Sequence, residues 1–236
     1  MTRFALDWIA RMIISPTTLA TAPLAPLLDR LFEHDAAASP ASNPAVTQLS
    51  REERERRMRS KTDYLDFYRG LKDLPLAVSR QTGALLYMLA RGCRARTIIE
   101  FGTSFGVSTL HLAAALRDNG GGRLIGSEFE PSKVARARDN LTKAGLIDLV
   151  EIREGDALRT LSADLPDTID LLLLDGAKGL YPDILGLIES PLRPGAFIVA
   201  DNADYSPDYL ARVRSPAQGY MSTPFANEVE LSIRIG

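Results

Sequence analysis

The stretch from Thr97 to Gly106 constrains the fold of this chain more than any other part of it. It begins with the apolar, β-branched run 97–99, which is typical of a buried strand in a parallel sheet. It ends in Glu-x-Gly-x-x-x-Gly, and a helical stretch follows over about 107–116. Gly102 and Gly106 lack Cβ, so the backbone can turn tightly and a ligand can approach closely. A strand, a glycine turn and a helix in this order present backbone N–H groups to a small molecule. The alternative is that the glycines only let the helix pack on the strand.

The turn differs from the common phosphate-binding motifs. It is neither G-x-G-x-x-G nor G-x-x-x-x-G-K-[ST], and no lysine follows Gly106. A loop so poor in basic residues fits a ligand without a diphosphate. The next predicted strand, 123–127, leads into Glu128, and a carboxylate at such a strand end can accept both hydroxyls of a ribose. The alternative for Glu128 is an ordinary exposed loop acid.

Apolar runs and helical stretches alternate along the rest of the chain. Further strands are predicted at 149–153, 170–174, 196–200 and 229–235. Helices are predicted at 79–90, 131–144, 181–188 and 208–213, and a turn at 191–195. Strands that alternate with helices indicate an α/β fold, with a mostly parallel sheet and helices on both faces.

Composition narrows the class of protein. The 236 residues are 45 % hydrophobic and 25 % charged with a net charge of -2, which is ordinary for a globular protein and gives no nucleic-acid footprint. The single Cys93 excludes an internal disulfide and indicates a reducing compartment. With His34 and His111 as the only histidines, no Cys/His zinc cluster can form. Neither a signal peptide nor a membrane-spanning run is evident, so we expect a soluble, cytoplasmic protein with no membrane partner.

The N-terminal part reads as an addition to the main domain. Residues 1–50 are predicted to be a helical extension and linker, and residues 51–236 the domain itself. An amphipathic helix over 4–13 is expected to pack on the domain or on a second subunit in a homodimer; membrane-surface docking is the alternative. A helical piece over 25–32 and a loop over 35–48 follow. Ser50 and Glu53 match a capping box that begins the next helix.

Two apolar strands end in acids. The run 171–174 ends at Asp175, with Lys178 three residues on, and the run 197–200 ends at Asp201-Asn202. Ligands bind beyond the carboxyl ends of the strands in an open α/β sheet, so these groups are expected to converge near Gly102. Two carboxylates and an amide oxygen suit Mg²⁺. The alternative is that these acids only cap loops.

Lys178 is a candidate base. It can act so only if its pKa falls well below about 10.4, and a nearby divalent cation and partial burial both push it down. A metal would also lower the pKa of a bound hydroxyl. A salt bridge from Lys178 to Asp175 or Asp201 is the alternative role.

Together these motifs resemble a known family. From about Leu76 onward the chain is similar to the class I S-adenosyl-L-methionine (SAM)-dependent methyltransferases, in particular the metal-dependent catechol O-methyltransferase group, with caffeoyl-CoA-type enzymes as relatives. The matching pieces are Ile99-Glu100-Phe101-Gly102-Thr103-Ser104-Phe105-Gly106, Ile125-Gly126-Ser127-Glu128, Asn140-Leu141-Thr142-Lys143-Ala144-Gly145, Asp175-Gly176-Ala177-Lys178 and Ala200-Asp201-Asn202. The resemblance implies a Rossmann-like, seven-stranded sheet whose last strand is antiparallel.

The resemblance also assigns roles. The residues implied around the methionine part of the cofactor are Glu100, Gly102, Ser104 and Ser108, covered by Ala77 and Val78. Glu128 would hold the ribose, and Asp156 with Ala157 would edge the adenine. Asp175, beside the cofactor, would bind Mg²⁺ with Asp201 and Asn202, and Lys178 would be the base. Glu230 matches the position of a glutamate that accepts a hydrogen bond from the second catechol hydroxyl.

The chain departs from this group in two places. Gly176 and Ala177 stand where catechol enzymes carry bulky groups that grip the substrate ring, and the connection 213–229 is short. Both departures indicate a wider or differently walled acceptor pocket. The function implied is Mg²⁺-dependent methyl transfer from SAM to a small phenolic vicinal diol.

Three other functions stay open from the sequence. One is a SAM-binding protein of the same fold that does no methyl transfer or needs no metal. The second is a nicotinamide-dependent oxidoreductase, which the missing G-x-G-x-x-G disfavours. The third is a non-enzymatic interaction module, which polar groups at several strand ends disfavour.

Overall fold

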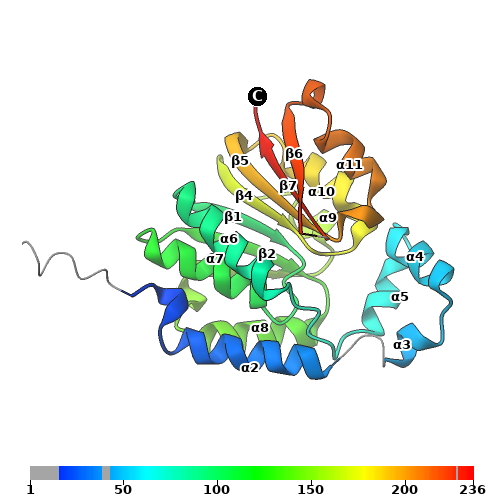
Figure 1. Cartoon of the computed structure of the whole chain (residues 1–236), viewed down its shortest axis with the longest axis horizontal. Coiled ribbons are helices and arrows are strands. Elements are labelled where there is room, and N and C mark those ends of the chain that lie inside the picture. Colours follow the sequence, from blue (N-terminus) through cyan, green and yellow to red (C-terminus); the bar gives the residue numbers. More distant parts are fainter. Residues whose placement is uncertain (1–15, 39–42, 227) are drawn as a thin grey trace, which may run out of the picture.

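The computed structural model describes residues 16–38, 43–226 and 228–236. They form a seven-stranded sheet in the order β3-β2-β1-β4-β5-β7-β6 (Figure 1). The strands are β1 (Thr97–Phe101), β2 (Arg123–Glu128), β3 (Val150–Glu154), β4 (Ile169–Leu174), β5 (Leu192–Asp201), β6 (Tyr220–Phe225) and β7 (Val229–Arg234). The pairs β3-β2-β1-β4-β5 are parallel, and β7 is antiparallel to both of its neighbours. The predicted fold class is confirmed, with the last strand antiparallel.

Alternate residues of the central strands feed two separate cores. Ile98 and Leu171 pack on the helices of one face, whereas Ile99 and Leu172 pack on those of the other. Such double burial explains why these strands read as continuous apolar runs. The first face carries α2 (Leu24–Ala37), α6 (Arg80–Gly92), α7 (Val107–Asp118) and α8 (Pro131–Lys143). The second carries α9 (Ala157–Thr160), α10 (Tyr181–Ile188) and α11 (Pro207–Val213) (Figure 1).

Three short helices gather at one end of the molecule. They are α3 (Pro44–Thr47), α4 (Arg51–Arg59) and α5 (Tyr64–Arg69) (Figure 1). They share a small core of Val46, Phe67, Leu71 and Leu74. The helix α4 packs against two 3₁₀ turns, η4 (Lys178–Leu180) and η5 (Ala203–Tyr205). This contact brings the N-terminal helices to the ends of β4 and β5.

Of the two hydrogen bonds of the capping box predicted at the start of α4, one is formed. Ser50 Oγ accepts a hydrogen bond from the Glu53 N–H at 3.1 Å, as expected. The Glu53 carboxylate does not return to the Ser50 N–H but pairs with Arg56 and Arg57. The guanidinium groups of Arg56 and Arg57, one helical turn further along, form charge-assisted hydrogen bonds with Glu53. These are stronger than a bond to the neutral Ser50 N–H, so the Glu53 carboxylate turns toward the arginines.

Three local predictions differ from the structure. The predicted turn 191–195 is the beginning of β5, because Leu192 pairs with Ile169 ahead of a register shift that accommodates the Pro194-Gly195 pair. The predicted loop 35–48 contains the end of α2 and all of α3, whose cap is Asn43. The strand β6 was not located individually, since it is an edge strand with Pro224 and exposed polar residues.

The helix predicted over 4–13 lies outside the described residues. The helix α2 buries Leu24, Leu27 and Leu28 in the core that also holds α7. The predicted boundary between an N-terminal extension and the main domain, at residues 50/51, stays a prediction. Within the described part of the chain, no helix has both the length and the apolar character needed to cross a membrane.

Candidate active site

A cavity of about 590 Å³ lies beyond the carboxyl ends of β1, β2, β4 and β5. The strand-end groups that line it include Gly102, Glu128, Asp175, Asp201 and Asn202. The opposite wall comes from α4, α5 and the segment 76–79. The sheet therefore gathers the predicted strand-end groups around one cavity, as expected for the open edge of an α/β sheet.

The glycine turn is fixed by close packing against the next loop. Gly102 has a φ of +99°, and a Cβ there would lie 2.6 Å from the Asp175 backbone. The Asp175 N–H donates to the Phe101 carbonyl at 2.8 Å. Gly106 caps α7 with a φ of +85°. Position 102 requires glycine, because the backbone has a positive φ and there is no space for a Cβ.

Glu100 lies beneath the turn and is not among the residues that line the cavity. Its Oε1 accepts from Ser108 at 2.6 Å, and its Oε2 accepts from Thr109 at 2.6 Å and Thr103 at 3.1 Å. Burial raises the pKa of Glu100 to about 7. Glu100 therefore orders the start of α7, while Ser108 lines a small adjoining hollow together with Ala77 and Val78.

Glu128 is held in a fixed position at the end of β2. Its Oε2 accepts from the Ser104 N–H at 2.8 Å, and its Oε1 accepts from the Glu130 N–H at 3.0 Å. The Ser104 hydroxyl donates to the Pro75 carbonyl at 2.5 Å, which joins the turn to the segment ahead of α6. The fixed carboxylate faces the cavity, as its predicted role requires.

Lys133 was not predicted from the sequence but also lines the cavity. It is buried in α8, and its Nζ donates to Ser104 Oγ at 3.1 Å. Burial lowers the pKa of Lys133, against the opposing effect of Glu128. A lysine in the first turn of a helix is usually exposed to solvent. The sequence alone therefore gives no sign that Lys133 is buried.

The adenine-edge residues lie at the start of α9. Asp156 caps this helix, its Oδ1 accepting from the Leu158 N–H at 2.9 Å. Asp156 and Ala157 both line the cavity, next to Gly155.

The acids that follow β4 and β5 meet around Lys178. Its Nζ lies 3.0 Å from Asp175 Oδ1 and 3.8 Å from Asp201 Oδ2. Lys178 is only 4 % exposed. Burial alone would lower the pKa of Lys178, but Tyr181, Asp175 and Asp201 together hold it well above its ordinary value. In this arrangement Lys178 is an ammonium ion.

The loop after β5 completes the set of oxygen donors. Asn202 is left-handed, with a φ of +48°, and lines the cavity beside Asp201. The Tyr181 hydroxyl donates to the Asp201 carbonyl at 2.7 Å and fixes this loop. No group of three or more His, Cys, Asp or Glu in the described ranges could hold a metal ion. A cation here therefore needs the Asn202 amide and water besides the two carboxylates, a donor set that suits Mg²⁺.

Comparison with known proteins shows which proteins the chain is similar to. Residues 99–203 match a family model described as "Methyltransferase domain". A catechol O-methyltransferase of Niastella koreensis is 38 % identical over 130 residues, which is 54 % of this chain and 58 % of that protein. One of Mycobacterium tuberculosis is 37 % identical over 131 residues, 55 % of this chain and 59 % of that protein.

Over residues 99–203 the chain is thus similar to the methyltransferase domain family, and over about half of its length it is similar to catechol O-methyltransferases. It spans less than two thirds of the length of these two curated relatives. A solved O-methyltransferase, TomG from Streptomyces achromogenes, in complex with SAM, aligns with a TM-score of 0.62 and 25 % identity. That alignment covers 87 % of this chain and 99 % of TomG.

Glu230 does not occupy the place that the family resemblance implies. It is 2 % exposed in β7, and its carboxylate accepts two bonds from Arg214, at 2.8 and 2.7 Å, and one from Ser222 at 2.6 Å. Glu228, just before β7, lines the cavity instead. In this geometry the Glu230 carboxylate is paired with Arg214 and does not line the cavity, so its contact with a substrate stays a prediction.

The N-terminal wall of the cavity was not predicted either. Apolar side chains from α3 to α5 and the loop after them line it, namely Val46, Met58, Tyr64, Phe67, Tyr68 and Leu71. Arg51 and Arg54 of α4 line it as well. The sequence did not predict this wall, because which side chains meet the cavity depends on packing between segments far apart in the sequence.

Packing against Phe101 explains why residue 176 is a glycine. A Cβ on Gly176 would lie 2.4 Å from the Phe101 ring, so Phe101 fills the space that a larger side chain would need. Gly176 and Ala177 both line the cavity. This part of the cavity is thus shaped by Phe101 and the N-terminal helices, without bulky side chains at positions 176 and 177.

Proposed function

We propose that this chain is a Mg²⁺-dependent O-methyltransferase that moves the methyl group of SAM to one of two neighbouring hydroxyls of a phenolic acceptor. The observation that carries the proposal is the position of Asp175, Lys178, Asp201 and Asn202 in the same cavity as the glycine turn and Glu128. A methyl donor and a metal-chelating acceptor would then share one enclosed space. Holding two reactants in contact is a large part of such catalysis.

The cofactor would occupy the β1–β2 side of the cavity. The Glu128 carboxylate, held by two backbone N–H groups, would accept from the ribose hydroxyls. Asp156 and Ala157 would border the adenine. Gly102 and Val78 would enclose the methionine part, with Ser104 near its end. SAM-bound TomG, which aligns over almost its whole length, supports this assignment.

Asp175, Asp201 and Asn202 would hold the cation through oxygen atoms. When bound, Mg²⁺ would act as a Lewis acid that stabilises the acceptor oxyanion. The same two carboxylates now keep Lys178 protonated. If their charge were shared with a bound cation, the pKa of Lys178 would fall, and its Nζ could take the proton from the acceptor hydroxyl. The deprotonated oxygen would then attack the methyl carbon in line with the S–CH3 bond, which breaks and releases S-adenosylhomocysteine, while Lys178 keeps the proton.

The setting of the reaction is part of the proposal. A single Cys93 and a net charge of -2 support a reducing, cytoplasmic environment and a small-molecule acceptor in place of a nucleic acid. A homodimer through residues 4–13 stays a prediction, because those residues lie outside the described ranges.

The decisive experiment is methyl transfer from labelled SAM to a panel of catechols and single phenols, with Mg²⁺ and then with EDTA. We expect transfer to vicinal diols that EDTA abolishes. Transfer that survives EDTA would refute the chelation mechanism while keeping the methyltransferase. Absence of transfer with SAM still bound would favour the non-methylating alternative.

A variant locates the metal site. Asp201→Ala should lose metal-dependent turnover by at least about a hundredfold and keep SAM binding, because the carboxylate belongs to the acceptor side of the cavity. The matched control is Asp204→Ala, which removes an exposed acid three residues on that does not line the cavity. Normal turnover of Asp201→Ala would show that the metal site is misassigned.

A further inference from the structure

We propose that the acceptor carries a carboxylate on its ring substituent and that Arg54 of α4 binds this group. The inference rests on the proposed function and adds the chemical class of the substrate. It concerns the wall of the cavity built by the N-terminal helices, which lies outside the family match over residues 99–203.

One face of α4 looks into the cavity. Arg51, Arg54, Glu55 and Met58 line it, at the i, i+3, i+4 and i+7 spacing of a single helix face. The same helix packs against η4, which contains Lys178, and against η5, which follows Asn202. Arg54 is therefore part of the wall that adjoins the two loops carrying the acid groups.

The other cations of the cavity already have partners. Lys178 pairs with Asp175 and Asp201, and Lys133 donates to Ser104. Arg51 pairs with Glu55, Nε to Oε1, at 2.9 Å.

Arg54 differs from these three cations. It is half-buried, and among the residues that the structure describes it forms neither an ion pair nor a side-chain hydrogen bond. Arg54 is therefore the cavity cation left available for a ligand, and a planar guanidinium matches the geometry of a carboxylate.

Several largely apolar side chains line the same cavity as the acid cluster and Arg54. Met58, Phe67, Tyr68 and Leu180 line the cavity together with these groups. Such a surface fits an aromatic ring and a short chain. A ligand with two adjacent hydroxyls, an apolar body and a carboxylate matches the kinds of side chain that line this cavity.

The alternative partner for Arg54 is Glu228, which lines the cavity from the start of β7. No ion pair joins the two side chains. If Arg54 served only to close the wall onto Glu228, its loss would affect all acceptors alike. Recognition of a substrate carboxylate would affect only acceptors that carry one, so the two roles differ in their outcome.

The test compares three acceptors with the same catechol ring and different charge: dihydrocaffeate, its uncharged methyl ester, and the cationic dopamine. The readout is kcat/KM for methyl transfer with Mg²⁺. We expect wild type to prefer the acid over the ester by about tenfold, the value of one charge-assisted contact at a half-buried site. Arg54→Ala should lose that factor on the acid and change the ester by less than about twofold.

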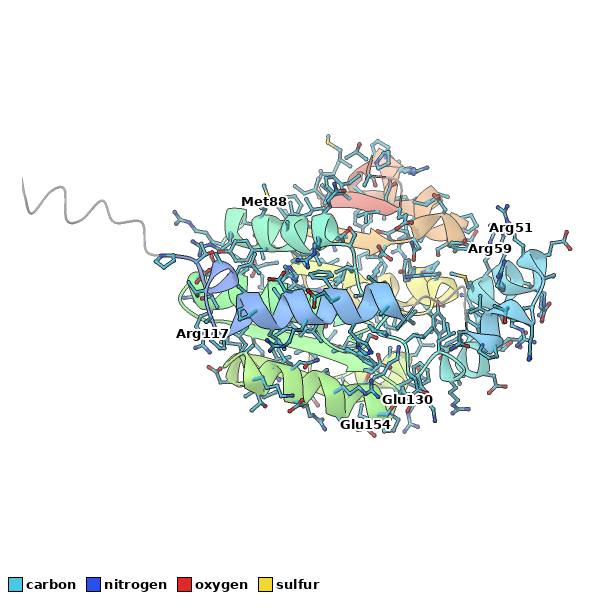
Figure 2. All side chains as sticks on the ribbon, turned by 60° about the horizontal axis from the view of Figure 1, so that its bottom comes forward. Arg51, Arg59, Met88, Arg117, Glu130 and Glu154 are labelled. Atoms are coloured by element: carbon cyan, nitrogen blue, oxygen red, sulfur yellow. The ribbon has the colours of Figure 1, made fainter. Side chains whose placement is uncertain are left out.

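Two further variants keep the result interpretable. Arg54→Glu should reverse the preference, favouring dopamine over the acid, which a general folding defect cannot do. Arg59→Ala is the matched control, since it removes the same charge from an exposed position of the same helix that does not line the cavity (Figure 2). It should leave all three acceptors unchanged.

The outcomes separate the two proposals. Equal use of acid and ester by wild type, or an equal loss on both in Arg54→Ala, would overturn the carboxylate assignment while the methyltransferase stands. No metal-dependent transfer to any of the three acceptors would overturn the proposed function, and the substrate class with it.

Discussion

At the scale of single residues, the buried Glu100 shows how the site is supported from below. Three hydroxyl groups donate to its carboxylate, and all three belong to the turn or to the first part of α7. Hydrogen bonds to a carboxylate favour its charged form, while burial disfavours it. Burial has the larger effect here, because the pKa of Glu100 rises to about 7.

This shift predicts a pH-dependent contribution to stability. The pKa of Glu100 rises from 4.5 to about 7 on folding, so the folded state binds more protons between these pH values. The contribution is therefore fully present below pH 4.5 and is lost as the pH rises to about 7, by at most about 3 kcal/mol. Glu100→Gln removes the titrating group. Its free energy of unfolding should thus rise relative to wild type over this pH range.

Urea denaturation of both proteins across this pH range measures the difference. Subtracting the two curves cancels the other titrating groups that both proteins share. Parallel curves for the two proteins would contradict the shifted pKa.

The residues that were predictable are those whose role depends on position along one strand. Asp175, Asp201 and Glu128 each follow an apolar run, and parallel strands bring such ends to one edge. Glu230 could not be judged this way. Its function depends on Arg214, which reaches it from the end of α11, and a sequence shows no sign of that pairing.

At the scale of elements, the tight packing of the β1 turn on the β4 turn sets the shape of the site. Gly102→Ala would place a methyl group 2.6 Å from the Asp175 backbone in a left-handed conformation. Steric overlap and backbone strain together should cost at least about 2–4 kcal/mol. The matched change Gly186→Ala, in α10 with no atom within 4 Å of the new Cβ, should stabilise by about 0.5–1 kcal/mol.

Thermal unfolding of the two variants beside wild type tests this contrast. A small effect of Gly102→Ala would show that the two turns are not rigidly packed. Loss of stability in Gly186→Ala would show that the surface of α10 there is not open.

Elements with strong periodicity were predictable, and those fixed by partners were not. The helix α10 (Tyr181–Ile188) was placed at its observed bounds because its apolar face and flanking turn are local signals. The start of β5 was misplaced, since Pro194-Gly195 is locally a turn signal that sheet pairing overrides. The short helices α3 and α5 have too few residues to show a period of their own.

At the scale of the whole molecule, the two ends of the cavity are formed by different strands. Glu128 ends β2, and Asp201 ends β5, with β1 and β4 between them in the sheet. Each end keeps its own hydrogen bonds: Glu128 is held by the N–H groups of Ser104 and Glu130, and the Asp201 carbonyl by Tyr181. Binding at the two ends should therefore be separable by mutation.

Ligand-induced thermal shifts give the prediction. A ligand at about a hundred times its Kd adds about 2.7 kcal/mol to the stability of the folded state. Glu128→Gln keeps the size of the side chain but weakens its bonds to ribose hydroxyls, so SAM affinity should fall about tenfold and the shift shrink by about half. Asp201→Ala should keep the full SAM shift. Glu154→Gln is the control, because this exposed residue pairs with Glu128 across β2 and β3 but does not line the cavity (Figure 2).

The pattern across the three variants decides the matter. A reduced SAM shift in Glu128→Gln alone places the ribose at the end of β2 and leaves the β5 end to the acceptor. An equal loss of the shift in Asp201→Ala would mean that the two ends form one binding unit, so that the cofactor cannot bind without an intact acceptor side. Since two strands, β1 and β4, lie between the strands that carry the two carboxylates, a measurement on the folded chain is needed to distinguish these arrangements.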